Sequence, residues 1–381
     1  MRRILQVLLS VSVVCFCNLS NINAKEETIV LAGSDYQGSD PTQSARQVTE
    51  ILTAMQRDGI EAIDGFLFAG DYTVKLDYNA KDSNEGLTSL KTTVQNVFPS
   101  LKEENIVMEQ GNHDNSKVGE PIYHSESGLH TFDAYSVYVI NEKDYPWESG
   151  NQAGSYYENI DVHTANCLKD SLEKLSKENY EKPIFVLCHI PLHITTRTNL
   201  YGDGEYGKYI FDVLNEYGKK NLNLFFLYGH NHSKGCENYL GGAAVFLKKG
   251  DEIYIPVLGC KHGANMEKGV TYTTETLNFT YMNAGYVGYF KDRGYSDGCL
   301  TMTAFKIDEE KVEIARYSKE GIHELKAKGI HANAYPSIDD TLIYESSQIV
   351  YLEKSELHKA KDKISEACSS ALQIIKEIGI K

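Results

Sequence analysis

Two short peptides in this chain carry metal-binding side chains, Gly111–Asp114 and Gly229–His232, and each directly follows an apolar run typical of a buried strand. Asp35, Asp71 and His189 follow three further runs of the same kind. Carboxylate, amide and imidazole donors without thiolates suit divalent ions such as Mn, Fe, Zn or Ni rather than a structural zinc cage. A lone Asp or His at such a place is usually a cap or a core residue. The ordered set of five sites therefore carries the prediction of a metal centre.

Five apolar runs are the predicted strands that must position these side chains. They are Thr28–Leu31, Phe66–Ala69, Ile106–Met108, Ile184–Cys188 and Leu224–Tyr228. Helices are predicted between Asp40 and Gly59, at Asn166–Lys177 and at Tyr209–Tyr217, so strands and helices alternate and the fold class is α/β. Ligands bind at the carboxyl ends of strands in such sheets. If His230 and His232 continue the last strand, their side chains share one face.

The second half of the chain changes pattern. One hairpin is predicted from Val245–Leu247 and Ile253–Leu258, and another from Leu300–Ile307 and Val312–Ala315. Residues 350–379 are predicted as an amphipathic helix.

The predicted donor set fits a pair of divalent ions bridged by one carboxylate. Two such ions, the carboxylates of Asp35 and Asp71 and a bridging hydroxide leave a pocket with a net positive charge. That pocket would attract a phosphate ester, and the ions would lower the pKa of bound water enough to provide a nucleophile at neutral pH.

These blocks, in this order, resemble the calcineurin-like metallophosphoesterase family, whose motifs run D-x-H, G-D, G-N-H-[DE], H and G-H-x-H. The resemblance spans roughly residues 28–310 and implies a β-sandwich flanked by helices, in four α/β/β/α layers. It implies one metal held by Asp35, position 37, Asp71 and His232. It implies a second metal held by Asp71, Asn112, His189 and His230, with Asp71 bridging. His113 would face the substrate and assist the leaving oxygen, with Asp114 orienting it, and Asn112 would stabilise the phosphoryl group.

The chain departs from the family pattern at Gln37, where the first motif has His. A carboxamide oxygen is a weaker donor than imidazole for late transition metals. Either Gln37 ligates and shifts preference toward a harder ion such as Mn, or water takes its place.

The predicted function is an exported phosphatase or phosphodiesterase with two divalent metal ions and a small phosphorylated substrate. The alternative is a non-catalytic protein that binds phosphate ligands or metal on the same scaffold. A serine hydrolase is disfavoured because the chain lacks G-x-S-x-G.

The first 24 residues have the features of a secretory signal peptide. Arg2 and Arg3 precede an apolar segment shorter than the roughly 18 residues that span a bilayer, and Ala24 precedes a charged stretch. We therefore expect residues 25–320 to form the catalytic domain, residues 321–381 a C-terminal extension, and the mature chain to lie outside the cytoplasm without a membrane span.

The net charge limits which partners are expected, and the cysteines raise the question of disulfides. Without the signal peptide, which carries two of the 38 basic residues, 36 basic and 53 acidic side chains give a net charge of −17. Such an acidic chain is not expected to bind a nucleic acid polymer. Six cysteines remain, at positions 167, 188, 236, 260, 299 and 368. They could form disulfides or stay as buried thiols, and both readings are open.

Overall fold

A computed structural model of the chain describes most residues between 27 and 377. The described residues are 27–38, 40–73, 75, 79–111, 113–114, 122–141, 162–190, 192, 205–230, 246–256, 272–289, 300–323, 326–328, 341–343 and 347–377. Contacts divide the chain into one compact unit, Thr28–Leu352, and a second that contains helix α6 (Glu356–Glu377). The predicted site residues all belong to the first unit.

The first sheet contains the strands that precede the first three predicted sites. β1 (Thr28–Gly33), β2 (Gly65–Ala69) and β3 (Ile106–Glu109) are neighbouring parallel strands in it. β13 (Thr301–Ile307) and β14 (Lys311–Ser318) continue the sheet on the other side of β1, as an antiparallel hairpin. Three short strands complete it: β12 (Gly285–Tyr286), β15 (Gly321–His323) and β18 (Ser347–Tyr351).

The second sheet contains the strands that precede the last two sites. Its order is β4 (Gly128–Thr131), β5 (Ser136–Ile140), β6 (Ile184–Cys188), β7 (Leu224–Tyr228), β11 (Thr280–Asn283) and β8 (Phe246–Leu247). β5, β6, β7 and β11 run parallel to one another. Two small sheets are formed by β9 (Glu252–Pro256) with β10 (Tyr272–Thr276), and by β16 (Lys326–Lys328) with β17 (Thr341–Ile343).

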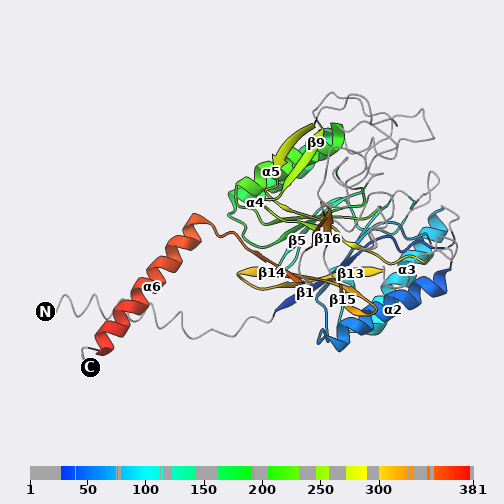
Figure 1. Ribbon diagram of the computed structural model, residues 1–381, viewed down its shortest axis with the longest axis horizontal. Helices are drawn as coiled ribbons and strands as arrows, with labels where there is room; N and C mark the ends of the chain where they lie inside the picture. The colour runs from blue at the N-terminus through cyan, green and yellow to red at the C-terminus, as the bar shows by residue number, and fades with distance from the viewer. Residues whose placement is uncertain are drawn as a thin grey trace. The chain divides into compact units, whose positions relative to one another are not determined.

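The two sheets face each other and helices cover their outer faces, which confirms the predicted four-layer α/β/β/α fold (Figure 1). Val30, Leu67 and Phe225 pack between the sheets, while alternate residues of the same strands pack under the helices. α2 (Pro41–Arg57) and α3 (Ala80–Val97) cover the first sheet. α4 (Val162–Lys177) and α5 (Glu205–Lys219) cover the second.

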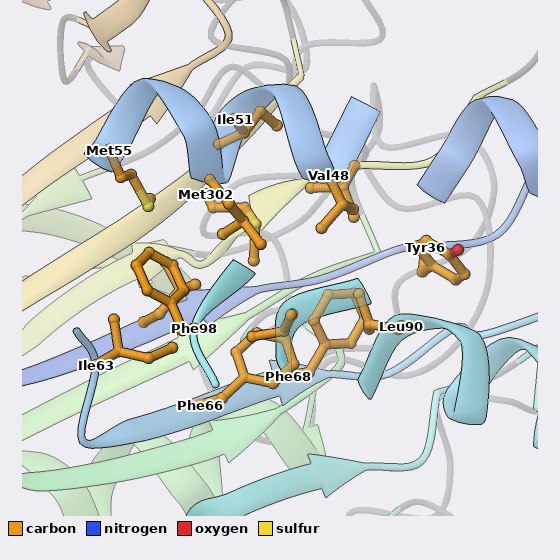
Figure 2. Close-up of a cluster of buried hydrophobic side chains, with 14 of the residues drawn as sticks. Tyr36, Val48, Ile51, Met55, Ile63, Phe66, Phe68, Leu90, Phe98 and Met302 are labelled. Atoms are coloured by element: carbon orange, nitrogen blue, oxygen red, sulfur yellow. The ribbon is translucent and has the colours of Figure 1, made fainter. Parts of the chain in front are cut away.

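The layer beneath α2 and α3 is densely packed with apolar side chains (Figure 2). Val48, Ile51 and Met55 of α2 meet Phe66 and Phe68 of β2 there. The helix begins where predicted, because the Asp40 side chain accepts a hydrogen bond from Gln43 N at its first turn. This packing fixes β2 just before the Gly70–Asp71 turn.

One predicted pairing is wrong. The hairpin of Val245–Leu247 with Ile253–Leu258 does not form: β8 pairs with β11, and β9 pairs with β10. The chain does turn at Gly250, whose φ is +100°. The two strands then separate because Phe246 and Leu247 become buried beside β11 on the edge of the second sheet, which a local hairpin does not offer.

Other differences concern elements and their bounds. Helix α3 and several strands, β4 and β5 among them, were not predicted. The C-terminal helix begins at Glu356 rather than at residue 350, which lies in β18, and residues 378 and 379 lie outside the described residues. The domain boundary expected after residue 320 stays a prediction; that position lies between β14 and β15, which pair antiparallel in one sheet. Among the described helices, none is both long and apolar enough to cross a bilayer. Cys167 and Cys368 are free thiols, Cys188 is buried, and the cysteines at positions 236, 260 and 299 lie outside the described residues.

Candidate metal centre

The loops that follow β1, β2, β6 and β7 meet at one edge of the two sheets. Asp35 N donates to Gly70 O at 3.0 Å, which joins the loops after β1 and β2. His230 N donates to Asp35 Oδ2 at 3.0 Å, which joins the first sheet to the second. Gly229 N donates to His189 O at 3.0 Å. The carboxyl ends of strands from both sheets therefore converge, as the sequence predicted.

Three predicted ligands form a compact cluster. One donor atom from each of Asp35, Asp71 and His189 lies within 4.8 Å of the others, and all three side chains are buried. His189 Nε2 lies 3.2 Å from Asp71 Oδ2. The His230 ring stands edge-on to the His189 ring, with 5.3 Å between centroids.

The backbone is strained at the predicted ligands. Asp35, Asp71 and His230 have φ values of 55°, 66° and 64°, in the left-handed region that non-glycine residues rarely adopt. In the described part of the chain, only Asn179 and Asn221 share this feature among non-glycine residues. Such strain concentrates at functional sites. It also corrects one expectation, because His230 is not extended and its side chain cannot be placed by strand alternation.

The hydrogen bonds of His189 show how its ring fits a cation. Nδ1 lies 2.6 Å from Ala69 O, so this nitrogen must carry a hydrogen and donate it. In the neutral ring, Nε2 then has a lone pair that faces Asp71 Oδ2. Two acceptors 3.2 Å apart repel each other unless a proton or a metal ion lies between them. The donor set therefore fits a divalent ion, and the Ala69 carbonyl is the outer partner that metal-binding histidines use.

Gln37 reaches the same carboxylate. Its side chain is buried, and Nε2 donates to Asp71 Oδ2 at 2.9 Å. Its backbone N donates to Asp71 O at 3.0 Å. Rotating the amide by half a turn would exchange its nitrogen and oxygen, and Oε1 would then face the cluster. Position 37 thus lies beside the Asp71 carboxylate, and ligation by Gln37 stays a prediction.

Asp114 holds the loops of the site together. Its carboxylate accepts hydrogen bonds from Asp71 N at 2.8 Å, Tyr72 N at 2.7 Å and Gly111 N at 2.8 Å. Glycine is required at 111, because a Cβ there would lie 2.3 Å from Asp71 Oδ1. These bonds give Asp114 a structural role in joining two ligand loops, while the predicted orientation of the His113 ring stays a prediction.

The structure places His113 but does not describe two of the predicted ligands. His113 N donates to Asp71 Oδ1 at 2.8 Å, which places this residue beside the predicted bridging carboxylate. Asn112 and His232, predicted as ligands, lie outside the described residues. Tyr36 and Tyr72, which follow Asp35 and Asp71 in the chain, are fully buried and pack in the core.

One acidic residue near the site was missed. Glu109, the last residue of β3, is fully buried and accepts a hydrogen bond from His189 N. A charged residue directly after the apolar run Ile106–Met108 was the available signal. Its carboxylate fixes the backbone of a predicted ligand and adds negative charge beside the cluster.

Burial and mutual charge shift the pKa values of the cluster. Burial raises the pKa of Asp35 to about 7, against attraction from His189. Burial alone would also raise the pKa of Asp71, but the attraction of His189 and His113 lowers it below its ordinary value. Burial would lower the pKa of His189, but the charges of Asp71 and Asp35 raise it well above 6.5. The cluster thus favours an added positive charge.

The metal-free protein should lose stability as pH rises. Burial and the charge of Asp71 raise the pKa of Asp114 to about 7, as burial does for Asp35. Such groups stabilise the fold while protonated, and His189 does the same while charged; these contributions are lost as pH rises through the folded pKa values. Asp71 works in the opposite sense, but only in strong acid. We expect the Tm of chelator-treated protein to fall between about pH 5 and about pH 8. Added Mn should reduce this fall in Tm. A Tm that stays flat or rises with pH in the metal-free protein would contradict the raised pKa values of Asp35, Asp114 and His189.

One comparison with known proteins identifies a family. Residues 38–234 match the family model of the calcineurin-like phosphoesterases, which is more than half of the 381 residues. No curated protein sequence matches the chain.

Solved structures with some similarity include a dimetal phosphatase from Danio rerio, at 10% identity over 77% of this chain and 96% of that chain, with a TM-score of 0.42. A predicted phosphoesterase from Streptococcus pneumoniae has 11% identity over 85% of this chain and 98% of its own, with a TM-score of 0.30. Vacuolar protein sorting 29 from Cryptosporidium parvum has 9% identity over 85% and 98%, with a TM-score of 0.31. Because the family model covers over half of the sequence and the strand ends deliver its motif residues to one cluster, this chain belongs to the calcineurin-like phosphoesterase family.

Proposed function

We propose that this protein is a metal-dependent phosphoester hydrolase, a phosphatase or phosphodiesterase that works with two divalent ions. The observation that supports it most is the buried cluster of Asp35, Asp71 and His189, in which His189 Nε2 faces Asp71 Oδ2 at 3.2 Å. Membership of the calcineurin-like phosphoesterase family supplies the reaction class.

Seven residues are proposed to hold the ions. Asp35, Gln37, Asp71 and His232 would hold one, and Asp71, Asn112, His189 and His230 would hold the other. Bound ions of this kind attract phosphoryl oxygens and lower the pKa of water. The chain's net charge of −15 makes such local positive charge necessary for binding a phosphate ester.

The chain's own side chains have separate tasks in this proposal. Asp71 is shared between the two sites, and its contacts with Gln37 Nε2, His189 Nε2 and His113 N hold its carboxylate in place. His113 would give a hydrogen bond or a proton to the leaving oxygen. Asp114 keeps the Asp71 and Gly111 loops in register through its three backbone hydrogen bonds.

Metal analysis combined with a generic aryl-phosphate assay tests the proposal. The purified chain should bind two ions and show turnover with added Mn, and a chelator should abolish that turnover. One ion or none, together with no turnover across Mn, Fe, Zn and Ni, would instead favour a non-catalytic binding protein on the same scaffold. One observation favours that rival: position 37 holds a carboxamide, which is a weaker ligand for late transition metals than the imidazole of the family motif.

Replacing Gln37 with His should tighten metal binding at a single site. The imidazole is a stronger ligand for late transition metals, so we expect roughly tenfold higher affinity for Zn, with less effect on Mn. Calorimetric titration of the metal-free Gln37→His protein with each ion measures this. Gln37→Asn is the matched control, since it keeps the amide. Equal Zn affinity in all three proteins would show that position 37 does not ligate.

We also propose that the mature chain acts outside the cytoplasm on a small phosphorylated substrate and not on a nucleic acid polymer. The support is the signal-like residues 1–24, which lie outside the described residues, and the acidic charge. Mass spectrometry of the N-terminus in the native source would test it, with cleavage near Ala24 as the expected result.

A further inference from the structure

Arg316 is a fully buried charged residue outside the metal cluster. It lies on β14, opposite Thr303 of β13, and none of its side chain is exposed. Nη2 donates to Asn283 O. Among the described residues, Nε and Nη1 have no hydrogen-bond partner, and no carboxylate forms an ion pair with this guanidinium. Burial lowers the pKa of Arg316 to about 10. A buried cation that is bonded only to a peptide oxygen disfavours folding. A role other than stability would account for a cation at this position.

Asn283, which accepts the hydrogen bond from Arg316, belongs to a segment that supports the metal site. This segment, Asn283–Gly288, begins at the last residue of β11, includes β12 and is called the cradle below. Ala284 N donates to Tyr228 O at 2.8 Å, and Asn283 Nδ2 lies 3.5 Å from Gly229 O. Both bonds reach the turn that presents His230. The cradle thus holds the end of β7 through hydrogen bonds to the carbonyl groups of Tyr228 and Gly229.

The same segment also supports the loop of Asp35 and Gln37. The Ser34 hydroxyl lies between Gly285 O and Asp35 Oδ2 and can donate to either. Val287 N donates to Ser34 O at 3.3 Å. Gly288 is pressed against this loop, because a Cβ there would lie 1.8 Å from Gln37 O. The cradle therefore contacts two predicted ligand loops, one from each sheet.

The cradle has its own internal supports. Asn283 Oδ1 accepts from Gly285 N at 2.9 Å, and Thr303 Oγ1 donates to Ala284 O at 2.9 Å. Gly285 has a φ of +127° and would place a Cβ 2.2 Å from Thr301 O, so the turn admits only glycine. Arg316 adds the hydrogen bond that ties the first residue of this turn to the opposite sheet.

We infer that Arg316 is a positioning residue for the metal centre, acting through the cradle on the Asp35 and His230 loops. The inference rests on the proposed function only because it takes from it that the site binds divalent metal ions. Arg316 and the cradle lie beyond residues 38–234, the part that matches the family model. The antiparallel strands β13 and β14, which carry Thr303 and Arg316, therefore help to support the metal site.

The test is a Mn²⁺ titration of the metal-free full-length protein, with free Mn²⁺ followed by electron paramagnetic resonance. Arg316→Met removes the charge and the donor but keeps an unbranched chain, and roughly tenfold weaker binding is expected, as for lost outer-shell partners. Arg316→Lys keeps a donor and should lose less. Ile314→Ala is the matched control, since Ile314 is buried on the same face of β14. It should bind Mn²⁺ like the wild type.

Wild-type affinity in Arg316→Met, or an equal loss in Ile314→Ala, would overturn the inference. If Arg316→Met does not fold, Asn283→Ala replaces it: this variant removes the side-chain bonds to Gly229 O and Gly285 N. Weaker Mn²⁺ binding by Asn283→Ala supports the inference, and unchanged binding overturns it. Because the readout is metal affinity, a wild-type protein that binds Mn²⁺ without hydrolysing phosphoesters would sink the proposed function and leave this inference standing.

Discussion

Turnover should fall by roughly three orders of magnitude or more when Asp71 is replaced by Ala, while the fold persists. Asp71 Oδ2 contacts both Gln37 Nε2 and His189 Nε2, and Oδ1 accepts from His113 N. Its carboxylate is the one group in the proposed site that serves both ions. The Asp71 backbone bond to Asp114 does not depend on the Asp71 side chain, so the loop should keep its course. Steady-state kinetics with an aryl phosphate and circular dichroism measure the two parts of this result.

The matched control is Asp170→Ala, which removes an exposed carboxylate from α4. It should leave kcat and metal content unchanged. His230→Ala should also lower turnover strongly, because it removes a proposed ligand of the second ion. Full activity in both Asp71→Ala and His230→Ala would refute the proposed reaction centre.

Phe68→Ala should lower the free energy of unfolding by about 3–5 kcal/mol. Phe68 has no exposed surface and lies beside Phe66 in this layer (Figure 2). The centroid of its ring is 5.8 Å from that of Phe66 and 5.4 Å from that of Tyr72. Truncation leaves a cavity beneath α2 and α3 that the surrounding helices cannot fill. Since domains of this kind are stable by only about 5–15 kcal/mol, the loss is a large share of the total.

Urea unfolding followed by fluorescence measures this change. Tyr351→Ala is the control, because Tyr351 is an aromatic residue on β18 that is 73% exposed. It should alter the unfolding free energy by no more than about 0.5 kcal/mol. If the unfolding free energy of Phe68→Ala lies within about 1 kcal/mol of the wild-type value, the layer beneath α2 and α3 repacks and the predicted cavity does not form.

The strand ends of the site could be predicted because their signals are local. Short apolar runs followed by Asp or His identify β1, β2, β6 and β7, and Asp40 identifies the start of α2. Helix α3 escaped prediction because its sequence is largely polar, with Gly86 inside it. Tertiary packing of Leu87, Leu90 and Val94 stabilises it instead.

Pairing between distant strands could not be predicted from the sequence. β8 pairs with β11 because Phe246 and Leu247 gain burial there, and no local pattern reports that alternative. The same limit applies to Glu109, Asn283 and Arg316. These residues act through hydrogen bonds to atoms 80, 54 and 33 residues away in the chain, and only the folded structure brings those atoms together.

The left-handed backbone conformation of Asp35, Asp71 and His230 could not be predicted from the sequence either. Residue type favours this conformation at Gly and, more weakly, at Asn, Asp and His, but it does not say which of these residues adopt it. His230 adopts it because its N–H bonds to Asp35 Oδ2 and its turn lies on the cradle. The motifs therefore predicted that Asp35, Asp71 and His189 gather, but not the backbone conformation that gathers them.

The most direct test of the metal centre is anomalous X-ray diffraction from crystals of the Mn-loaded protein. We expect two anomalous peaks about 3.5–4 Å apart, with the Asp71 carboxylate between them. One peak should lie beside Asp35 and the other beside His189 and His230. Crystals soaked in Mn that show no peak at these side chains, or a peak only elsewhere on the surface, would contradict the assignment.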